Sequence, residues 1–543
     1  MDRRSVSESN VAPDIGALRE SALQAVRAGR LAEAEACCRQ ILKAEPRHFE
    51  SLHLLGILFL RHGLPADAVL QFDLALEAKP DEPDVHNNRG NALKELKRLD
   101  AAVASYRKAI ALRPRFAEAH INLANALLAL ERFDEALDNY DRAIELKPYP
   151  SAIFSRAVAL LKLGRLDEAL TGCDRTIALE PNHAEAHNVR GNVLVALNRA
   201  DEALLSYDRS IALDPARAEA FYDRSHCRLL KGQYPGGWAD HEWRWQSKGF
   251  PGRRPEIDAP PWRGQNLQGR RILVFREQGY GDIIQFARYL PLLRQCGADV
   301  TFLLSPQLRR LLSPLTAGVE VISELSGAEF DFQCALMSLP FGFKTDLSSV
   351  PDTVPYLRAE PDLIHRWRER IGPRGFKIGI AWRGNPKALD KARFIPLAQF
   401  IPLARLPSVR LISLQSRDGL DPLGDLPADV NIETLGDDFD RGPDAFIDTA
   451  AVMANLDLII SCDTAIPHLA GALGLPVWVA LKHAPDWRWL LDRHDSPWYL
   501  TARLFRQSRR DDWTSAFAEI ERELRSLISS SASTSAGGGG TPP

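Results

Sequence analysis

The sequence has no run of about 18 apolar residues, so no membrane-spanning helix is expected. Its start, MDRRSVSESNVAPD, has no apolar stretch behind the arginines, so no secretory signal is expected either. Cysteines number seven, an odd count without a CxxC pair, and no HExxH occurs, which disfavours a disulfide framework and a zinc site. We therefore expect a cytoplasmic protein, and association with a membrane surface stays open.

Neither sign of charge is in excess. Lys+Arg is 68 and Asp+Glu is 71, a formal net charge of −3, which argues against a dedicated nucleic-acid binder. The hydrophobic fraction of 45% and the charged fraction of 26% are ordinary for folded globular protein. A length of 543 residues predicts three or four domain-sized units, at about 150 residues each.

A repeat occupies the first half of the chain. Each unit ends in an apolar run and a proline, and successive prolines are 34, 34, 34, 33 and 34 residues apart. The three markers of the repeat are Pro46, Pro80, Pro114, Pro148, Pro181 and Pro215; Ala34, Ala68, Ala102, Ala136, Ala169 and Ala203; and Gly56, Gly90, Ala124, Ala157, Gly191 and Ser225. Small residues let two helices cross closely, and proline ends the second helix. The pattern predicts helical hairpins stacked into an α-solenoid.

These markers resemble the tetratricopeptide repeat (TPR) family over residues 14–246, in six units and a degenerate seventh. Residues 1–13 are expected to be a disordered N-terminus. The last unit departs into YPGGWADHEWRW. Its tryptophans Trp238, Trp243 and Trp245 either dock the solenoid onto the next domain or form an exposed binding face. We favour docking because large aromatic side chains tend to be buried.

Asparagines recur on the first helix of several units. Asn88 and Asn122 share one position, and Asn91, Asn125 and Asn192 share another. A row of amides can hydrogen-bond the backbone of an extended peptide, because an amide both donates and accepts. The resemblance to TPR superhelices implies such a use, because asparagine rows in that family bind peptides in this way. The groove is therefore a candidate site for a protein or peptide, and the alternative is that the asparagines only solvate the helices.

The pattern changes at about residue 250. Residues 247–268 are rich in Pro and Gly and are typical of a linker or docking segment. Short β-branched runs then alternate with helical segments, which predicts an α/β fold with two parallel-sheet units at 269–362 and 376–511. The expected strands are 271–276, 299–304, 319–325, 330–338, 377–382, 409–415, 456–460 and 476–481, and the expected helices are 282–296, 306–312, 396–404, 444–453 and 464–474.

The end of the chain is predicted to hold one more helix and a tail. A helix at 512–528 is expected to cross back to the first α/β unit. Residues 529–543 read SSSASTSAGGGGTPP. This segment has no apolar periodicity and is expected to be disordered.

Three polar loops follow predicted strands, where α/β sheets bind their ligands. The first, FREQGYGDIIQ, has Gly279 and Gly281 but no third glycine, so it is an incomplete dinucleotide fingerprint. It places Asp282 at a helix start, either as a simple N-cap or as a general base over a cleft.

The second and third loops carry groups suited to phosphate. The second, at 381–397, carries the cations Arg383, Lys387, Lys391 and Arg393. The third, SCDTAIPHLAG, opens a helix near Asp463 or Thr464, whose free N–H groups form an anion site, and His468 lies one turn further. Each loop alone is also compatible with a capped helix or a solvated surface, and the three together favour a phosphorylated ligand.

The motifs GDIIQFARYLP, AWRGNP…DKARFIPL and DTAIPHLAGALGLP resemble the ADP-heptose transferase-like glycosyltransferases of family 9, over about 260–528. The resemblance implies a GT-B fold of two Rossmann-like units, with the acceptor side first and the nucleotide-sugar side second. It also implies no metal and no other cofactor. The fusion to TPR repeats is a recurrent bacterial architecture, and APDWRWLLDRHDSPWYL looks like its usual ending.

The resemblance also implies roles by position. Asp282, with Gly281 beside it, matches the loop aspartate that acts as base on the acceptor hydroxyl. Lys391 or Arg393, with Arg383, matches the cationic loop that faces the diphosphate. Asp463 and Thr464, with His468 nearby, match the helix start that holds the phosphates, although Ala465 stands where the family usually has glycine. Asp438 and Asp440 spell DxD, but we expect no metal site there because the strand context is missing.

The predicted function is an inverting glycosyltransferase that moves a sugar from a nucleotide-sugar to an acceptor hydroxyl, while the TPR repeats recruit the acceptor or a partner protein. The rival hypothesis is a TPR scaffold whose transferase-like domain is degenerate and does not catalyse. A nucleotide-binding dehydrogenase ranks third, because the glycine fingerprint is incomplete.

Overall fold

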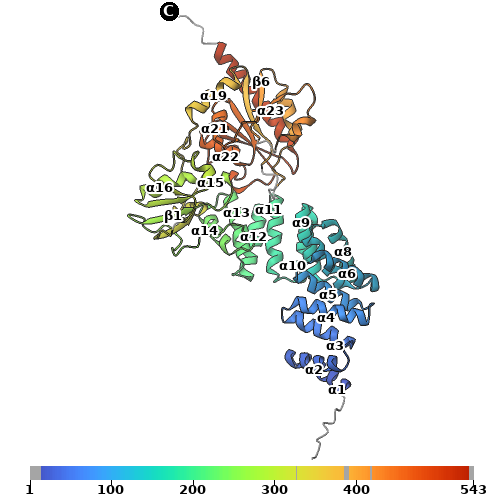
Figure 1. The fold of residues 1–543 in the computed structure, drawn as a ribbon. Coiled ribbons are helices and arrows are strands. Elements are labelled where there is room, and N and C mark those ends of the chain that lie inside the picture. Colours follow the sequence, from blue (N-terminus) through green and yellow to red (C-terminus); the bar gives the residue numbers. More distant parts are fainter. Residues whose placement is uncertain (1–13, 326, 385–390, 416–418, 537–543) are drawn as a thin grey trace, which may run out of the picture. The chain divides into compact units, whose positions relative to one another are not determined.

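The computed structural model describes residues 14–325, 327–384, 391–415 and 419–536, and Figure 1 shows the chain as a ribbon. The chain forms two compact units, residues 1–193 and residues 194–543. The division falls inside helix α11 (Ala184–Ala196), earlier than the predicted end of the solenoid at residue 246. The last helical hairpins therefore belong to the same compact unit as the α/β part.

The first unit is a succession of helices, each packed against the next. They are α1 (Ile15–Arg27), α2 (Leu31–Ala44), α3 (Phe49–Arg61), α4 (Pro65–Ala78), α5 (Pro83–Glu95), α6 (Leu99–Leu112), α7 (Ala117–Ala129), α8 (Phe133–Leu146), α9 (Pro150–Leu163) and α10 (Leu166–Leu179). The repeat prolines act as predicted: α2 ends two residues before Pro46, and α4 ends two residues before Pro80. The predicted solenoid is confirmed.

The small-residue positions lie where paired helices touch. A Cβ atom at Gly56 would lie 2.5 Å from the ring of Phe72, which is fully buried in the next helix. Gly90 faces the buried ring of Tyr106 in the same way. Glycine is thus required by close helix crossing rather than by backbone conformation.

The turn between paired helices has a left-handed residue at a fixed repeat position. Gly29, Gly63 and Gly164 occupy it with φ between 70° and 74°, but Lys97 and Glu131 adopt it with φ of 60° and 59°. An L-residue is strained there, whereas glycine is not. We expect Lys97→Gly to raise the free energy of unfolding by about 0.5–1 kcal/mol in urea denaturation.

A matched control is Gly63→Ala. Nothing lies within 4 Å of a Cβ atom at Gly63, so only backbone strain opposes the methyl group. This variant should lose about 1 kcal/mol. Equal stability of Lys97→Gly and the parent chain would show that the turn carries no strain at this position.

The second unit begins with helical hairpins and continues into an α/β part. Its helices are α12 (Ala200–Leu213), α13 (Ala218–Leu230), α14 (Tyr234–His241), η1 (Glu242–Gln246), α15 (Tyr280–Phe286), η2 (Ala287–Tyr289), α16 (Leu290–Gln295), α17 (Pro306–Arg309), η3 (Leu336–Ser338), α18 (Leu339–Gly342), α19 (Pro361–Ile371), η4 (Leu397–Phe400), α20 (Ile401–Ala404), η6 (Asp421–Asp425), α21 (Ile447–Met453), α22 (Ala465–Ala472), η7 (Trp487–Trp489) and α23 (Trp513–Ala536), where η marks a 3₁₀ helix. In the described residues, no helix is both long and apolar enough to cross a membrane.

Two parallel sheets form the α/β part, as predicted. Within the described residues the first sheet has the order β3-β2-β1-β4 and the second β10-β9-β8-β5-β6-β7, and every pairing between these strands is parallel. The strands are β1 (Arg271–Phe275), β2 (Asp299–Leu303), β3 (Glu320–Ile322), β4 (Phe332–Ala335), β5 (Phe376–Ala381), β6 (Val409–Ser413), β7 (Ile432–Glu433), β8 (Leu458–Cys462), β9 (Val477–Leu481) and β10 (Ala502–Arg506). Strands β8 and β9 are buried along their whole length, because helices cover both faces of such sheets.

Several helix predictions need correction. The expected helix at 282–296 is divided into α15, η2 and α16, because Pro291 has no N–H to donate to the carbonyl four residues earlier.

The helix predicted at 512–528 extends to Ala536, so residues 529–536 are helical rather than disordered. Serine and alanine are tolerated in helices, and the first strong helix breaker is Gly537. The remainder of the predicted tail and the predicted disordered N-terminus lie outside the described residues.

Helix α23 also packs differently from the prediction. Its Phe517 contacts Phe400 at a ring distance of 4.9 Å, and Trp513, Ile520 and Leu524 join the core of the second sheet. The helix stays on its own sheet because its apolar stripe is covered there, so it does not cross back to the first sheet.

The last helical hairpin docks onto the α/β part. Trp238 is 1% exposed and meets the rings of Trp487 at 5.3 Å and Phe286 at 6.3 Å. Trp245 lies 6.0 Å from Phe275 at the end of β1, and Trp243 stacks on a ring of α13. Trp238 and Trp245 therefore dock the hairpin onto the α/β part, whereas Trp243 packs within the hairpin itself.

Candidate functional site

A cleft of about 810 Å³ opens at the carboxyl ends of the two sheets. It brings together most of the residues predicted from the three loops: Gly281, Asp282, Arg383, Arg393, Asp463, Thr464 and His468. Lys391 is exposed and does not line it, and Lys387 lies outside the described residues. The parallel topology explains why residues of the three loops line one cleft, since the loops after β1, β5 and β8 all lie at the carboxyl ends of their strands.

Asp282 lies in the first wall of the cleft, and its carboxylate has two polar partners. One carboxylate oxygen accepts the backbone N–H of Gly279 at 2.9 Å, and the other is paired with the guanidinium of Arg488. The side chain is 19% exposed. Burial raises the pKa of Asp282 above its usual value, although the Arg488 charge opposes this shift. Asp282 is thus both a helix cap and a carboxylate that reaches the cleft.

Arg488 connects the two walls and was missed by the sequence prediction. Its guanidinium donates to Asp486 and to Gln285, each at 2.8 Å, besides pairing with Asp282. The side chain is buried and lies over the ring of Trp487 at 4.4 Å. The segment APDWRW, which resembles the usual ending of the family, was the one pointer to it in the sequence.

Two carboxylates of the second wall titrate differently. Burial and the nearby charge of Asp486 raise the pKa of Asp463 to about 7. Burial alone would raise the pKa of Asp486, but the guanidinium and N–H of Arg488 outweigh it and hold that pKa below its usual value. Near neutral pH, Asp463 therefore exchanges a proton while Asp486 stays charged.

The start of α22 lines one corner of the cleft. Thr464 is the N-cap, and its hydroxyl accepts the N–H of Ile466 at 3.4 Å. Gly281 from the first wall comes close, because a Cβ there would lie 3.0 Å from the His468 ring and 3.4 Å from the Cα of Ala465. Glycine at 281 thus allows the two walls to meet.

His468 is not a cation. It is 4% exposed, its Nδ1 hydrogen-bonds the hydroxyl of Tyr499 at 2.9 Å, and its ring stacks on Trp489. Burial and the nearby Arg488 charge lower the pKa of His468 to about 3. The imidazole is neutral at physiological pH and offers a hydrogen bond rather than a positive charge.

Arginines supply the positive charge of the cleft. Arg393 lines it, and its Nε is buried without a hydrogen-bond partner among the described residues. The backbone N–H of Arg383 donates to Gln415 at 3.0 Å, and its guanidinium lies 3.6 Å from Asp421. Arg276, directly after β1, also lines the cleft and was not predicted.

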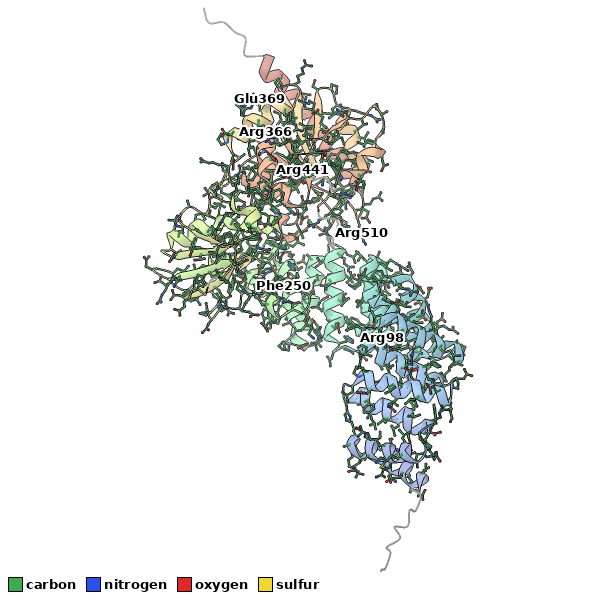
Figure 2. The ribbon with its side chains drawn as sticks, in the orientation of Figure 1. Arg98, Phe250, Arg366, Glu369, Arg441 and Arg510 are labelled. Carbon is green, nitrogen blue, oxygen red and sulfur yellow. The ribbon has the colours of Figure 1, made fainter. Side chains whose placement is uncertain are left out.

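Both carboxylates of the DxD pair have partners within the chain. Asp440 accepts the N–H of Asp448 at 3.0 Å and that of Thr449 at 3.3 Å, so it caps α21. Asp438 pairs with Arg370 and with Arg366, which Figure 2 labels on the second unit. In the described residues, no group of three or more His, Cys, Asp or Glu side chains could hold a metal ion.

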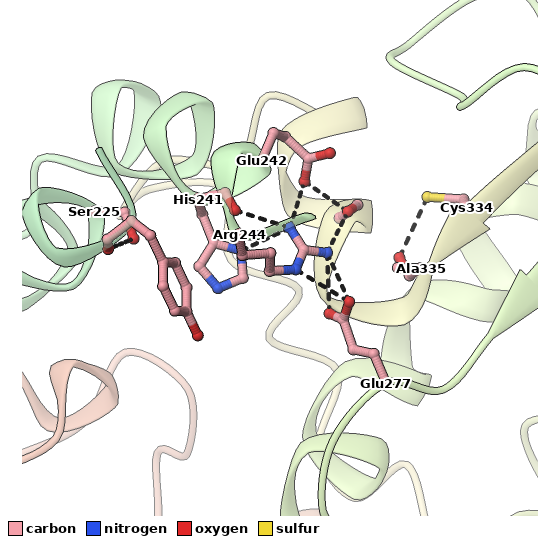
Figure 3. Close-up of polar contacts among 9 residues, drawn as sticks. Ser225, His241, Glu242, Arg244, Glu277, Cys334 and Ala335 are labelled. Carbon is pink, nitrogen blue, oxygen red and sulfur yellow. Dashed lines mark hydrogen bonds and ion pairs between the residues drawn. The ribbon is translucent and has the colours of Figure 1, made fainter. Parts of the chain in front are cut away.

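A buried ion network fastens the cleft loop to the last hairpin. Figure 3 shows the guanidinium of Arg244, from η1, between Glu242 and Glu277. Arg244 is fully buried and Glu277 is 1% exposed, and the shortest bonds to Glu277 and to Ser338 are 2.8 Å and 2.7 Å. Glu277 lies between two cleft-lining residues, Arg276 and Gln278, so its anchorage holds that wall.

The predicted asparagine row is largely engaged with the chain itself. Asn91 accepts from Tyr106 at 2.8 Å, and Asn125 accepts from Tyr140 at 2.6 Å.

Two further asparagines link successive repeats. Asn88 contacts His53 at 3.0 Å, and Asn122 donates to Asn87 at 2.9 Å, while Asn192 is half-buried on α11. The row therefore stabilises the repeats, and the half-buried amides still border the surface of the unit.

The fold and the cleft define a TPR array joined to a two-sheet α/β part. The tetratricopeptide repeat family matches residues 20–83, 117–150 and 154–234, and a further TPR repeat match covers residues 90–130. The chain thus carries TPR repeats, which form protein-interaction solenoids, over about residues 20–234.

Similar proteins were found in two further comparisons. Protein FlbA of Caulobacter vibrioides is 27% identical over 337 residues, which are 57% of this chain and 55% of FlbA, so the chain spans about half the length of this relative. A solved TPR protein from Parabacteroides merdae is 18% identical, with a TM-score of 0.37, over 44% of this chain and 94% of its own. YrrB, described as a TPR protein with an unusual peptide-binding site, is 25% identical with a TM-score of 0.28, over 32% and 89%.

Proposed function

We propose that this protein is an inverting glycosyltransferase with a GT-B arrangement, which moves a sugar from a nucleotide-sugar to an acceptor hydroxyl. The observation that carries the proposal is the cleft itself. The cleft has a volume of about 810 Å³. Asp282 lines it from the first parallel sheet, and Thr464 at the start of α22 lines it with the arginines of the second sheet. A carboxylate and an anion site on opposite walls suit a donor diphosphate on one side and an acceptor hydroxyl on the other.

The second sheet would hold the donor. The N–H groups at the start of α22 would face a bound anion, and the helix dipole favours negative charge there. The buried Nε of Arg393, which has no hydrogen-bond partner among the described residues, could bind a phosphate oxygen, and Arg383 lies on the same wall. A neutral Asp463 below pH 7 would reduce the repulsion of the diphosphate.

The first sheet would supply the base. Asp282 takes the proton of the acceptor hydroxyl as its oxygen bonds to the anomeric carbon. The bond between that carbon and the diphosphate oxygen breaks, and the configuration inverts. The arginines and the α22 dipole stabilise the departing diphosphate. Arg488 keeps the carboxylate of Asp282 charged and oriented before the reaction.

The TPR repeats would recruit the acceptor or a partner protein. A protein or peptide is the proposed ligand of their groove, where the half-buried amides of Asn88 and Asn122 offer hydrogen bonds besides those they make within the unit. An acceptor on a protein would then be held by a surface separate from the chemistry.

Nucleotide binding tests the donor site. Thermal unfolding of the full chain with ADP, CDP, GDP and UDP and their sugar conjugates should give a clear rise in melting temperature for one nucleotide. A ligand at 100 times its Kd stabilises the native state by about 2.7 kcal/mol. Arg393→Ala should weaken this binding about tenfold, because a charge-assisted hydrogen bond is lost.

Lys391→Ala is the matched control, since Lys391 is two residues away, exposed and outside the cleft. It should bind as the parent chain does. Absence of a shift with every nucleotide would overturn the donor site and favour the second candidate, a TPR scaffold without catalysis. The observation that favours this second candidate is the ion pair between Asp282 and Arg488, because a carboxylate already bound to a guanidinium is a weaker base.

A further inference from the structure

Two aromatic rings meet across the cleft, one from each wall. Tyr280 is the first residue of α15 and is 37% exposed, and Phe446 is the residue before α21. Both line the cleft, and their ring centroids are 5.9 Å apart with an edge-to-face angle of 86°. The pair therefore lies at the seam where the two walls approach each other.

Phe446 is held in a conformation that phenylalanine disfavours. Its φ of 64° and ψ of 11° are left-handed, a region open to glycine but strained for a bulky L-residue. The helix start does not need its side chain, because Asp440 caps α21 by accepting the N–H groups of Asp448 and Thr449. The strained backbone places the Phe446 ring at the cleft, where the ring also packs against the edge of the hydrophobic core.

The place of the pair indicates what it contacts. Tyr280 is two residues from Asp282, the proposed base, and Phe446 reaches it from the wall that holds the proposed phosphate corner. A donor anchored by its diphosphate on α22 would extend its sugar within the same cleft toward the seam. One face of a pyranose ring is lined by C–H groups and packs well against an aromatic ring.

We propose that Tyr280 and Phe446 form an aromatic clamp that binds the sugar ring of the donor and so determines donor specificity. This inference rests on the proposed function. It separates the donor into two parts: the diphosphate is recognised by charge at α22, and the sugar is recognised by shape and by C–H contacts at the clamp.

The experiment compares affinities for a nucleoside diphosphate and for its hexose conjugate, measured by calorimetry with ADP, CDP, GDP and UDP. Phe446→Ala, Phe446→Gly and Tyr280→Ala should each bind the sugar conjugate about tenfold more weakly. Affinity for the nucleoside diphosphate should stay within twofold of the parent chain. Equal loss of affinity for both ligands, or no loss for either, would overturn the clamp.

The two substitutions at Phe446 separate binding from folding. Both remove the ring, but only glycine relieves the left-handed strain, so Phe446→Gly should melt about 2 °C above Phe446→Ala while binding equally poorly. Ser408→Gly is the control, since Ser408 has a φ of 66° on an exposed turn outside the cleft. It should gain stability with unchanged binding.

The proposed function and the clamp fail in different ways. If the parent chain binds no nucleoside diphosphate and no conjugate, the proposed function is wrong and the clamp falls with it. If the parent chain binds both and the ring variants bind the conjugate as well as the parent chain does, only the clamp is wrong, and Phe446 is then a packing residue.

Discussion

Replacing Arg244 by methionine is expected to lower the free energy of unfolding of the second unit by about 3–5 kcal/mol. Arg244 is fully buried and donates to Glu277, Glu242 and Ser338 (Figure 3). Methionine fills much of the same volume but leaves Glu277, which is 1% exposed, as an unpaired buried carboxylate. Urea denaturation followed by tryptophan fluorescence measures the loss, because Trp238 and Trp245 lie in the same docked hairpin.

The loss should depend on pH in a defined direction. Burial raises the pKa of Glu277 to about 6, and Arg244 opposes that shift. A carboxyl whose folded pKa lies above its unfolded value favours folding when protonated, and this contribution is lost as the pH rises through the folded pKa. Without Arg244 the pKa rises further, so the destabilisation by Arg244→Met should be larger at pH 8 than at pH 5.

Two variants test the interpretation. Arg310→Met removes an exposed arginine that pairs with Glu360, and it should cost less than about 1 kcal/mol. Glu277→Leu added to Arg244→Met removes the stranded carboxylate and should restore part of the stability, since apolar replacement of a whole buried pair is often tolerated. A double variant no more stable than Arg244→Met would show that packing, and not charge, dominates at this site.

The repeat part of the fold could be predicted almost entirely from the sequence. Each hairpin is held by local rules: small residues at the crossing such as Gly56, an aromatic ring such as Phe72 opposite it, and a proline after the helix. Because these rules act within 34 residues, they are visible as a period. Strands β7 and β10 were missed, since β7 has two residues and β10 gains its place only by pairing with β9.

The candidate site was predictable only where a loop contains its own pattern. Asp282, Thr464 and Arg393 follow strands and line the cleft. The sequence did not distinguish Lys391 from Arg393, because the two lie only two residues apart and only the structure shows which one lines the cleft. Arg488 was missed because its partner Asp282 lies 206 residues earlier in the chain. No local pattern encodes a contact of that separation; it follows from the packing of α15 against the loop after β9.

Asp282→Asn is expected to reduce sugar transfer by about 10²- to 10⁴-fold, the range that a positioned base contributes. Asparagine has nearly the same shape and can still accept the N–H of Gly279, but its amide cannot take the proton of an acceptor hydroxyl. Binding of the nucleoside diphosphate should stay unchanged, because Thr464 and Arg393 belong to the other wall. Initial rates with saturating donor, and calorimetry with the diphosphate, measure the two effects separately.

The control for this variant must disturb the buried ion network of Arg488 without removing the proposed base. Asp486→Asn does so, since Asp486 is the other carboxylate bound to Arg488. It should disturb the orientation of Arg488 and lower transfer far less than Asp282→Asn. Since burial raises the pKa of Asp282, transfer by the parent chain should fall with decreasing pH at a pKa above that of a free aspartate, and this limb should vanish in Asp282→Asn. Full transfer by Asp282→Asn would place the base elsewhere in the cleft, where Asp463, with its pKa of about 7, is the next carboxylate able to accept a proton.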